Sequence, residues 1–155
     1  MQSEKFNKEY LAICSGIFDK KIGTINLPIA RKPESIIERC ISKDGSPSIT
    51  NYEVLKEFKN YSLVKCTLKT GRTHQIRVHM TAIKHPLIGD SLYGTSSNLI
   101  NRQALHCYKL SFIHPITNKF IEFNAKLPDD ISLLLNAWFF CFLLLYLLSN
   151  LLLFF

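Results

Sequence analysis

The period of the apolar residues changes once along this chain, and that change restricts the folds it can adopt. Upstream, apolar and polar residues alternate in short runs, which is the pattern of β-strands. After His74 the apolar residues recur at helical spacing instead, at Ile76, Met80 and Ile83. The run stops before Pro86, so we expect one helix of about three turns.

Short β-prone runs lie on both sides of this helix. Two antiparallel hairpins are predicted, one around the Lys59-Asn60 turn and one around residues 114–118, which have turn composition. The expected strands are residues 10–14, 22–27, 48–55, 61–68, 105–112 and 120–125. The sequence therefore predicts an α+β fold, a mostly antiparallel mixed sheet with flanking helices.

The positive charge is concentrated in the first half of the chain. Of a net charge of +7, residues 1–84 hold 15 Lys and Arg against 8 Asp and Glu, whereas residues 85–155 hold 4 against 4. A basic surface favours a polyanion, because each neutralised phosphate releases counterions. A merely solubilising charge explains the composition equally well.

The cysteines indicate a reducing compartment. There are five, and no two form a Cys-x-x-Cys pair, so we expect reduced thiols and a cytoplasmic protein. Cys66, His74 and His79 suggest zinc as an alternative, but their spacing matches no standard ligand pattern and no fourth ligand is evident. We therefore predict no metal.

The last 25 residues form a separate segment by composition. Residues 131–155 contain no charged side chain, and 16 of them are Leu or Phe. As a helix they would span roughly 37 Å, which is enough to cross a bilayer. We expect one domain over residues 1–130 and a hydrophobic tail over 131–155, through which alone a membrane could be a partner.

Two adjacent motifs point to a family. Residues 71–80 read GRTHQIRVHM and residues 85–94 read HPLIGDSLYG. Together they resemble the signature of the RluA/RluD-type pseudouridine synthases, which isomerise uridine in RNA. The resemblance extends through other ordered motifs: KEYLAI (8–13), INLPI (25–29), TNYEV (50–54), RQALHCYKL (102–110) and LPDD (127–130).

The reaction breaks an N-glycosidic bond and rejoins the same base through carbon. It requires a carboxylate, a cation that keeps the carboxylate ionised, and an aromatic platform for the base. By this resemblance Arg77 is the catalytic-site cation, since a guanidinium stays charged when desolvated. Tyr10 matches the family tyrosine, whose ring contacts uracil and whose hydroxyl suits a proton transfer from carbon.

Three further residues are candidates for RNA binding. Arg72, His74 and Gln75 carry hydrogen-bond donors and lie at the expected start of the helix, where phosphate contacts are common. They could also orient Arg77. The resemblance implies ribosomal or transfer RNA as the substrate and no cofactor.

The family's catalytic aspartate has no counterpart in this sequence. Family members carry a His-Arg-Leu-Asp motif upstream of the tyrosine, and none of the chain's aspartates, Asp90 included, stands in that context. A buried Arg77 is therefore expected to lack its partner, and open sheet edges and exposed core are expected as well.

We interpret the sequence as a gene fragment, with an N-terminal loss upstream of Tyr10 and a frame change near Ile131, and expect it to be inactive alone. The frame change near Ile131 is suggested by the composition of the tail, because T-rich DNA read in another frame encodes mainly Leu and Phe. The alternatives left open are a non-catalytic RNA-binding module and a tail-anchored membrane protein.

Overall fold

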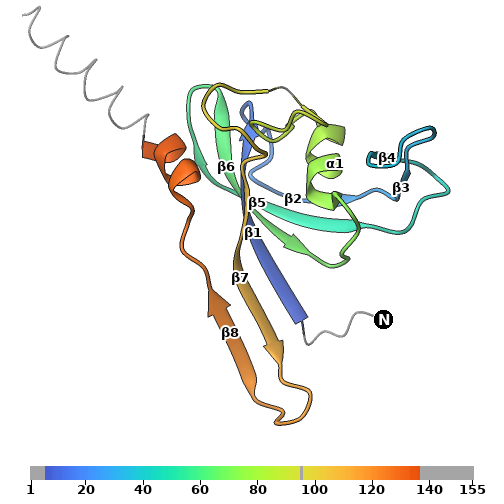
Figure 1. Ribbon diagram of the computed structural model, residues 1–155, viewed down its shortest axis with the longest axis vertical. Helices are drawn as coiled ribbons and strands as arrows, with labels where there is room; N and C mark the ends of the chain where they lie inside the picture. The colour runs from blue at the N-terminus through green and yellow to red at the C-terminus, as the bar shows by residue number, and fades with distance from the viewer. Residues whose placement is uncertain (1–5, 95, 137–155) are drawn as a thin grey trace, which may run out of the picture.

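A six-stranded antiparallel sheet forms the centre of the molecule. The computed structural model describes residues 6–94 and 96–136. The strand order is β2-β5-β6-β1-β7-β8, and β3 and β4 form a separate hairpin (Figure 1). The elements are β1 (Phe6–Ser15), β2 (Ile22–Asn26), β3 (Ile29–Arg31), β4 (Arg39–Ile41), β5 (Ile49–Glu57), β6 (Tyr61–Leu68), α1 (Gln75–Ala82), β7 (Leu105–Ile113) and β8 (Phe120–Asn124).

The predicted α+β class and both predicted hairpins are confirmed. β5 pairs with β6 and β7 pairs with β8, and every pairing between described strands is antiparallel. β1 begins earlier than predicted, at Phe6, because its first residues pair with β7; from Glu9 onward the strand pairs with β6 as well. It therefore occupies the centre of the sheet.

The helix is shorter than the three turns predicted. His74 adopts a left-handed conformation (φ 57°) and serves as the N-cap, so α1 starts one residue later. At the other end Lys84 is also left-handed (φ 67°). The N–H of His85 bonds to the carbonyl of Met80, and that of Lys84 to Thr81, which is a Schellman termination.

Two apolar clusters cover the two faces of the sheet. One lies under α1 and contains the fully buried Ala12, Cys14 and Met80. The other includes Ile13 together with Ile131 and Leu134, which belong to a helical segment at residues 129–136. The first residues of the predicted tail thus pack on the sheet, while residues 137–155 lie outside the described part of the chain. The boundary at 130/131 stays a prediction.

The β3–β4 hairpin was not predicted. It stands to one side of the sheet (Figure 1). Ile36 and Ile37, in the loop between its strands, are exposed. The hydroxyl of Tyr93 ties it to the body by accepting the N–H of Arg39 at 2.8 Å. Within residues 6–94 and 96–136, no helix is long and apolar enough to span a membrane.

Candidate functional site

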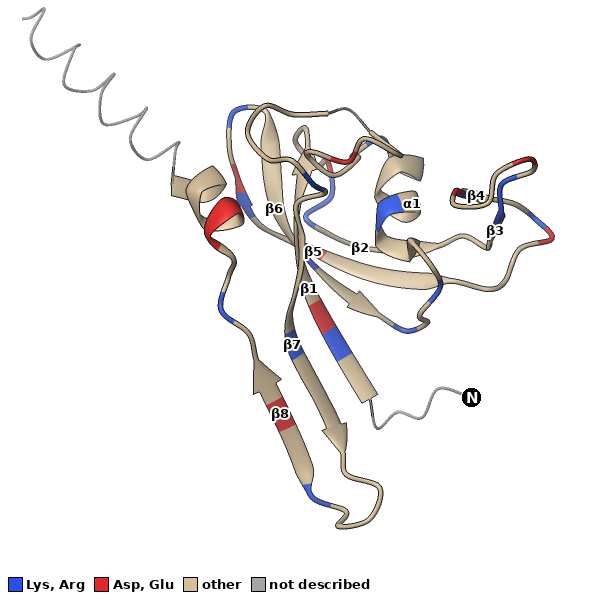
Figure 2. Cartoon of the chain, in the orientation of Figure 1, with Lys and Arg blue, Asp and Glu red and all other residues tan. Residues whose placement is uncertain are grey.

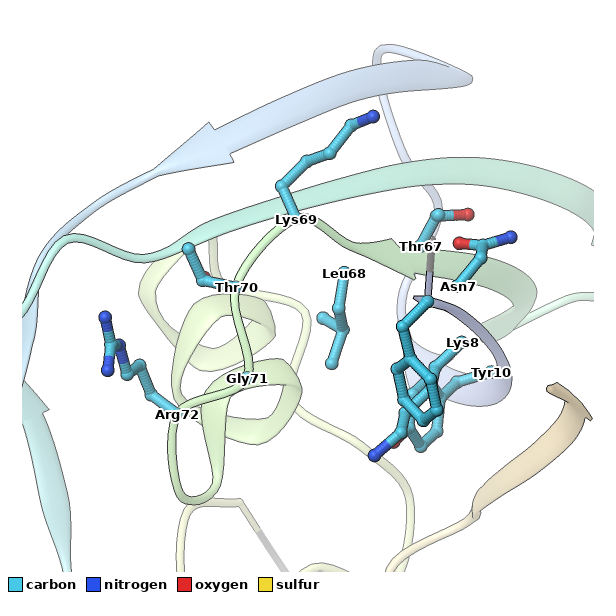
Figure 3. A pocket seen from close by; sticks show the side chains of 10 residues that line it. Asn7, Lys8, Tyr10, Thr67, Leu68, Lys69, Thr70, Gly71 and Arg72 are labelled. Carbon is cyan, nitrogen blue, oxygen red and sulfur yellow. The ribbon is translucent and has the colours of Figure 1, made fainter. Parts of the chain in front are cut away.

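A pocket of about 480 Å³ opens where β1 begins and β6 ends. Its size falls within the range of small-molecule sites. In Figure 3, Leu68 stands in the middle, with Arg72 on one side and Lys8 and Tyr10 on the other. The lining residues are Phe6, Asn7, Lys8, Tyr10, Thr67, Leu68, Lys69, Thr70, Gly71 and Arg72. Three of these are Lys or Arg and none is Asp or Glu, so the pocket is cationic.

The alternation of β1 explains where the pocket lies. Phe6, Lys8 and Tyr10 follow on the same strand face as Ala12 and Cys14, since successive side chains point to opposite faces. Ala12 and Cys14 are fully buried under α1, whereas Tyr10 is only partly buried at the margin of that cluster. The pocket therefore forms where this sheet face emerges from beneath the helix.

Tyr10 combines a packed ring with a protonated hydroxyl. It pairs with Cys66 on one side and Cys107 on the other. Burial raises the pKa of the Tyr10 phenol, and the neighbouring Cys107 thiol raises this pKa further. The hydroxyl is therefore neutral at physiological pH and can act as a hydrogen-bond donor.

Gln75 fixes the loop that bears Arg72. Its side chain is 2 % exposed, and its carbonyl oxygen accepts the Thr70 hydroxyl at 2.8 Å and the backbone N–H of Arg72 at 2.9 Å. Its amide nitrogen donates to Thr50 Oγ1 and to the carbonyl of Ile49, both at 3.0 Å. All of its polar atoms are thus engaged inside the protein, while Arg72 stays exposed at the pocket rim.

Arg77 forms a buried bidentate pair with Asp90. Its Nε and Nη2 each donate to one carboxylate oxygen at 2.7 Å, and the two side chains are 12 % and 0 % exposed. Asp90 also accepts the backbone N–H groups of Leu92 and Tyr93. The expectation that Arg77 would lack a carboxylate partner is wrong, because the loop after α1 supplies one. Figure 2 shows Lys or Arg in blue on α1, and the sequence of α1 has Arg77 as its Lys or Arg residue.

The pair fixes the charge state of both groups. The hydrogen bonds to Asp90 raise the pKa of the Arg77 guanidinium. Burial acts to raise the pKa of the Asp90 carboxyl, but the bonds from Arg77 and the backbone outweigh it and leave that pKa below its ordinary value. Both side chains are therefore charged.

His74 belongs to the same cluster through Tyr93. Its Nδ1 lies 2.8 Å from the Tyr93 hydroxyl, and the Arg77 guanidinium lies 4.8 Å from the centre of the Tyr93 ring. Burial, and then the charges of Arg77 and Arg39, lower the pKa of His74. The neutral ring can accept the phenolic hydrogen at Nδ1.

The predicted site residues thus fall into two neighbouring groups. Tyr10 and Arg72 share the pocket, whereas His74 and Arg77 meet around Asp90 and Tyr93. The buried Gln75 adjoins Arg72 at the start of α1.

Sequence reasoning missed four residues of these groups. Lys8 and Lys69 line the pocket, and Asp90 and Tyr93 hold Arg77 and His74. The available signals were the positions of Lys8 within KEYLAI and of Asp90 and Tyr93 within HPLIGDSLYG. A match to a sequence motif does not show which of the motif's side chains contact one another in the fold.

Cys66, His74 and His79, the alternative zinc ligands, have different partners in the fold. His79 is fully buried, with Nδ1 at 2.9 Å from Thr50 Oγ1 and Nε2 at 2.9 Å from the carbonyl of Leu27. His74 contacts Tyr93 instead, and Cys66 is buried in β6. Among the described residues, no three His, Cys, Asp or Glu side chains gather as a metal site.

Known proteins are similar to this chain in both sequence and fold. A family model described as RNA pseudouridylate synthase matches residues 1–82. The uncharacterized RNA pseudouridine synthase YjbO of Bacillus subtilis (strain 168) is 46% identical over 130 residues, which are 84% of this chain and 46% of that protein. Ribosomal large subunit pseudouridine synthase D of Haemophilus influenzae is 40% identical over 151 residues, covering 88% and 46%.

A solved structure agrees with these relatives. Human RNA Pseudouridylate Synthase Domain Containing 1 superposes with a TM-score of 0.68 at 30% identity, over 79% of this chain and 55% of that one. The chain spans about half the length of the curated relatives it matches.

Proposed function

The chain belongs to the RNA pseudouridylate synthase family, and from this membership we propose that it provides the uridine-binding half of an RNA pseudouridine synthase site. The observation that supports this best is the extent of the family match, residues 1–82, which includes Tyr10, the pocket and Arg77. The proposed substrate is a uridine in ribosomal or transfer RNA, and the proposed location is the cytoplasm.

Tyr10 is proposed to contact the uracil. The reaction breaks the bond between uracil N1 and ribose C1′, forms the bond from C5 to C1′, and exchanges a proton at C5 for one at N1. The detached base must stay in place meanwhile, and an aromatic face holds it by stacking. The protonated Tyr10 hydroxyl can donate a hydrogen bond to the base and relay its proton.

Arg77 is proposed to keep the reacting carboxylate ionised. Asp90 occupies Nε and Nη2, and Nη1 makes no hydrogen bond to any described residue. A second carboxylate at Nη1 would be stabilised in its charged form by the guanidinium. Asp90 then serves to orient Arg77, and His74 and Tyr93 support that orientation.

The pocket itself offers no group for the carboxylate's role. None of its ten lining residues bears a carboxyl group, and the 155 residues contain no His-Arg-Leu-Asp motif. We therefore propose that these 155 residues alone do not convert uridine. Tritium release from RNA containing 5-tritiated uridine should stay at background when they are assayed alone.

A chimera tests the proposal positively. In it, the described residues replace the matching segment of the Bacillus subtilis relative, so that the remaining half comes from a complete chain. The chimera should release tritium from bulk RNA, and Tyr10→Phe should abolish release while retaining RNA binding. Asp19→Asn, in an exposed loop, is the matched control. A folded chimera that binds RNA but never releases tritium would overturn the proposed activity.

A further inference from the structure

Unlike the six Lys or Arg side chains that form ion pairs, the three cations around the pocket have no carboxylate partner among the described residues. Six Lys or Arg side chains form ion pairs: Lys21 with Glu57, Lys32 with Glu38, Lys65 with Glu53, Arg77 with Asp90, Arg102 with Asp130 and Lys109 with Glu122. By contrast, Lys8, Lys69 and Arg72 form no ion pair with any described residue. Three unneutralised cations therefore surround one opening.

The three cations approach the pocket from two directions. Lys8 comes from β1, on the same face as Tyr10 and about 7 Å along the strand. Lys69 and Arg72 come from the segment that joins β6 to α1, as Figure 3 shows. Lys and Arg side chains thus border the opening from both segments.

Local contacts hold two of these cations in place. The ammonium of Lys8 lies 5.1 Å from the centre of the Phe6 ring, which also lines the pocket. The backbone N–H of Arg72 is fixed by Gln75, and its Nε reaches the carbonyl of Pro47 at 3.4 Å. The two Nη groups of Arg72 make no hydrogen bond within the described structure and remain available to a ligand.

We propose that Lys8, Lys69 and Arg72 form a phosphate clamp that grips the two backbone phosphates flanking the nucleotide whose base lies against Tyr10. The clamp rests on the proposed function, because it assumes a uridine of RNA in the pocket. Phosphates are the expected ligands, since they supply negative charge on both sides of a base, and the pocket lining contains no acid that would repel them. The clamp determines which backbone phosphates are bound and does not recognise the sequence of bases.

The test uses the 155-residue chain and a short single-stranded RNA with one central uridine. Affinity is measured by fluorescence anisotropy across a salt series for wild type, Lys8→Met and Lys69→Met. Methionine retains the apolar stem while removing the charge. Each substitution should weaken binding at 50 mM salt by roughly fivefold to tenfold and reduce the salt slope by about 0.7, the value expected for one lost phosphate contact on a single strand.

Lys59→Met is the matched control. Lys59 is exposed in the β5–β6 turn, at the end of β6 opposite the pocket. Its substitution should change neither affinity nor slope. Lys8→Arg and Lys69→Arg, which restore the charge, should recover the wild-type slope, so a variant that merely misfolds is distinguishable from one that loses a contact.

Neutral linkages locate the contacts. A methylphosphonate replaces the phosphate on the 5′ or the 3′ side of the uridine, one at a time. Each neutral linkage should weaken the binding of RNA to wild type. One of the two linkages should cause no further loss of affinity in Lys8→Met, and the other should cause no further loss of affinity in Lys69→Met.

Two results overturn the clamp, and they are distinguishable. If wild type binds RNA while Lys8→Met and Lys69→Met match Lys59→Met, the clamp is wrong and the proposed function stands. If wild type shows no binding at low salt in a folded sample, the proposed RNA-binding function fails and the clamp fails with it.

Discussion

Arg77 and Asp90 form the most enclosed charge pair of the described structure. The Asp90 side chain is completely buried and receives four hydrogen bonds, two from the Arg77 guanidinium and two from backbone N–H groups. Such a pair is costly to break from one side, because the remaining charge stays desolvated. The pair therefore fastens the loop after α1 to the helix.

Removing the charge of Asp90 should destabilise the fold. Asp90→Asn leaves the Arg77 guanidinium without its carboxylate, and we expect the free energy of unfolding to fall by about 3 kcal/mol. Urea denaturation followed by circular dichroism measures this. Asp19→Asn, at an exposed position, should change it by less than about 0.5 kcal/mol. Equal midpoints for the two variants would contradict the role given to the pair.

At this scale the sequence identified Arg77 but not its partner. The guanidinium was recognisable because it stands inside GRTHQIRVH, whereas Asp90 lies 13 residues away and only the fold brings the two together. Gln75 shows the other limit of sequence-based prediction, because a polar residue predicted to bind RNA is buried in the fold. Its amide could have faced RNA, but the tight approach of β5 to α1 buries it and satisfies every polar atom.

The helix α1 is anchored by buried polar side chains as well as by its apolar face. Thr50 of β5 is the centre of this contact, since its hydroxyl bonds both the amide of Gln75 and Nδ1 of His79. Because Nε2 of His79 faces a carbonyl, Nε2 bears the hydrogen and Nδ1 accepts from Thr50. The neutral imidazole fits this arrangement.

Stability should fall in mild acid. Burial lowers the pKa of His79 and of His74 below the ordinary 6.5, so below that pH the unfolded chain binds more protons than the folded one. The stabilisation is complete above pH 6.5 and is lost as the pH falls toward the folded pKa values. The slope is at most about 1.4 kcal/mol per pH unit for each histidine.

Urea denaturation at pH 7.5, 6.5, 5.5 and 5.0 measures this slope. His79→Gln removes one titrating group and should flatten the dependence between pH 6.5 and 5.0. A free energy of unfolding that is the same at all four values in wild type would show that these histidines do not link folding to pH.

Elements were predictable where their pattern is long. β6 was predicted at its observed bounds because eight residues alternate between defined turns. The β3–β4 hairpin was not predicted because each of its strands has only three residues, too few to show an alternating pattern. The predicted helix was too long because Ile83 continues the apolar spacing, although the left-handed conformation of Lys84 already ends α1 there.

The molecule as a whole has exposed aromatic residues along one edge of its sheet, on both faces of β8. β8 is the last strand in the sheet order, and Phe120 and Phe123 on it are 66 % and 58 % exposed. The ring of Phe123 stacks with Phe112, which also packs against Phe6. An apolar edge strand is a site of association between chains.

The chain should therefore self-associate as its concentration rises. Phe123→Lys places a charge on the β8 edge and should shift sedimentation profiles toward the monomer. Ile116→Lys, at an even more exposed apolar position in the β7–β8 turn, is the control and should leave the profiles unchanged. A wild-type chain that stays monomeric at millimolar concentration would refute this prediction.

At the scale of the molecule, ordered motifs identified the family that the similarity to known proteins then established. The pocket could not be predicted in the same way. It exists because the face of β1 emerges from beneath α1 next to the segment that joins β6 to α1, and that proximity depends on sheet register.

The central claim is that the pocket at Tyr10 holds the target uridine, and photocrosslinking tests it most directly. RNA containing a single 4-thiouridine is irradiated on the 155-residue chain, and the attached peptide is identified by mass spectrometry. We predict attachment within residues 6–10 or 67–72, the two segments that line the pocket, and its loss when unmodified RNA competes. Attachment confined to the β5–β6 turn or to residues 129–136 would contradict the account.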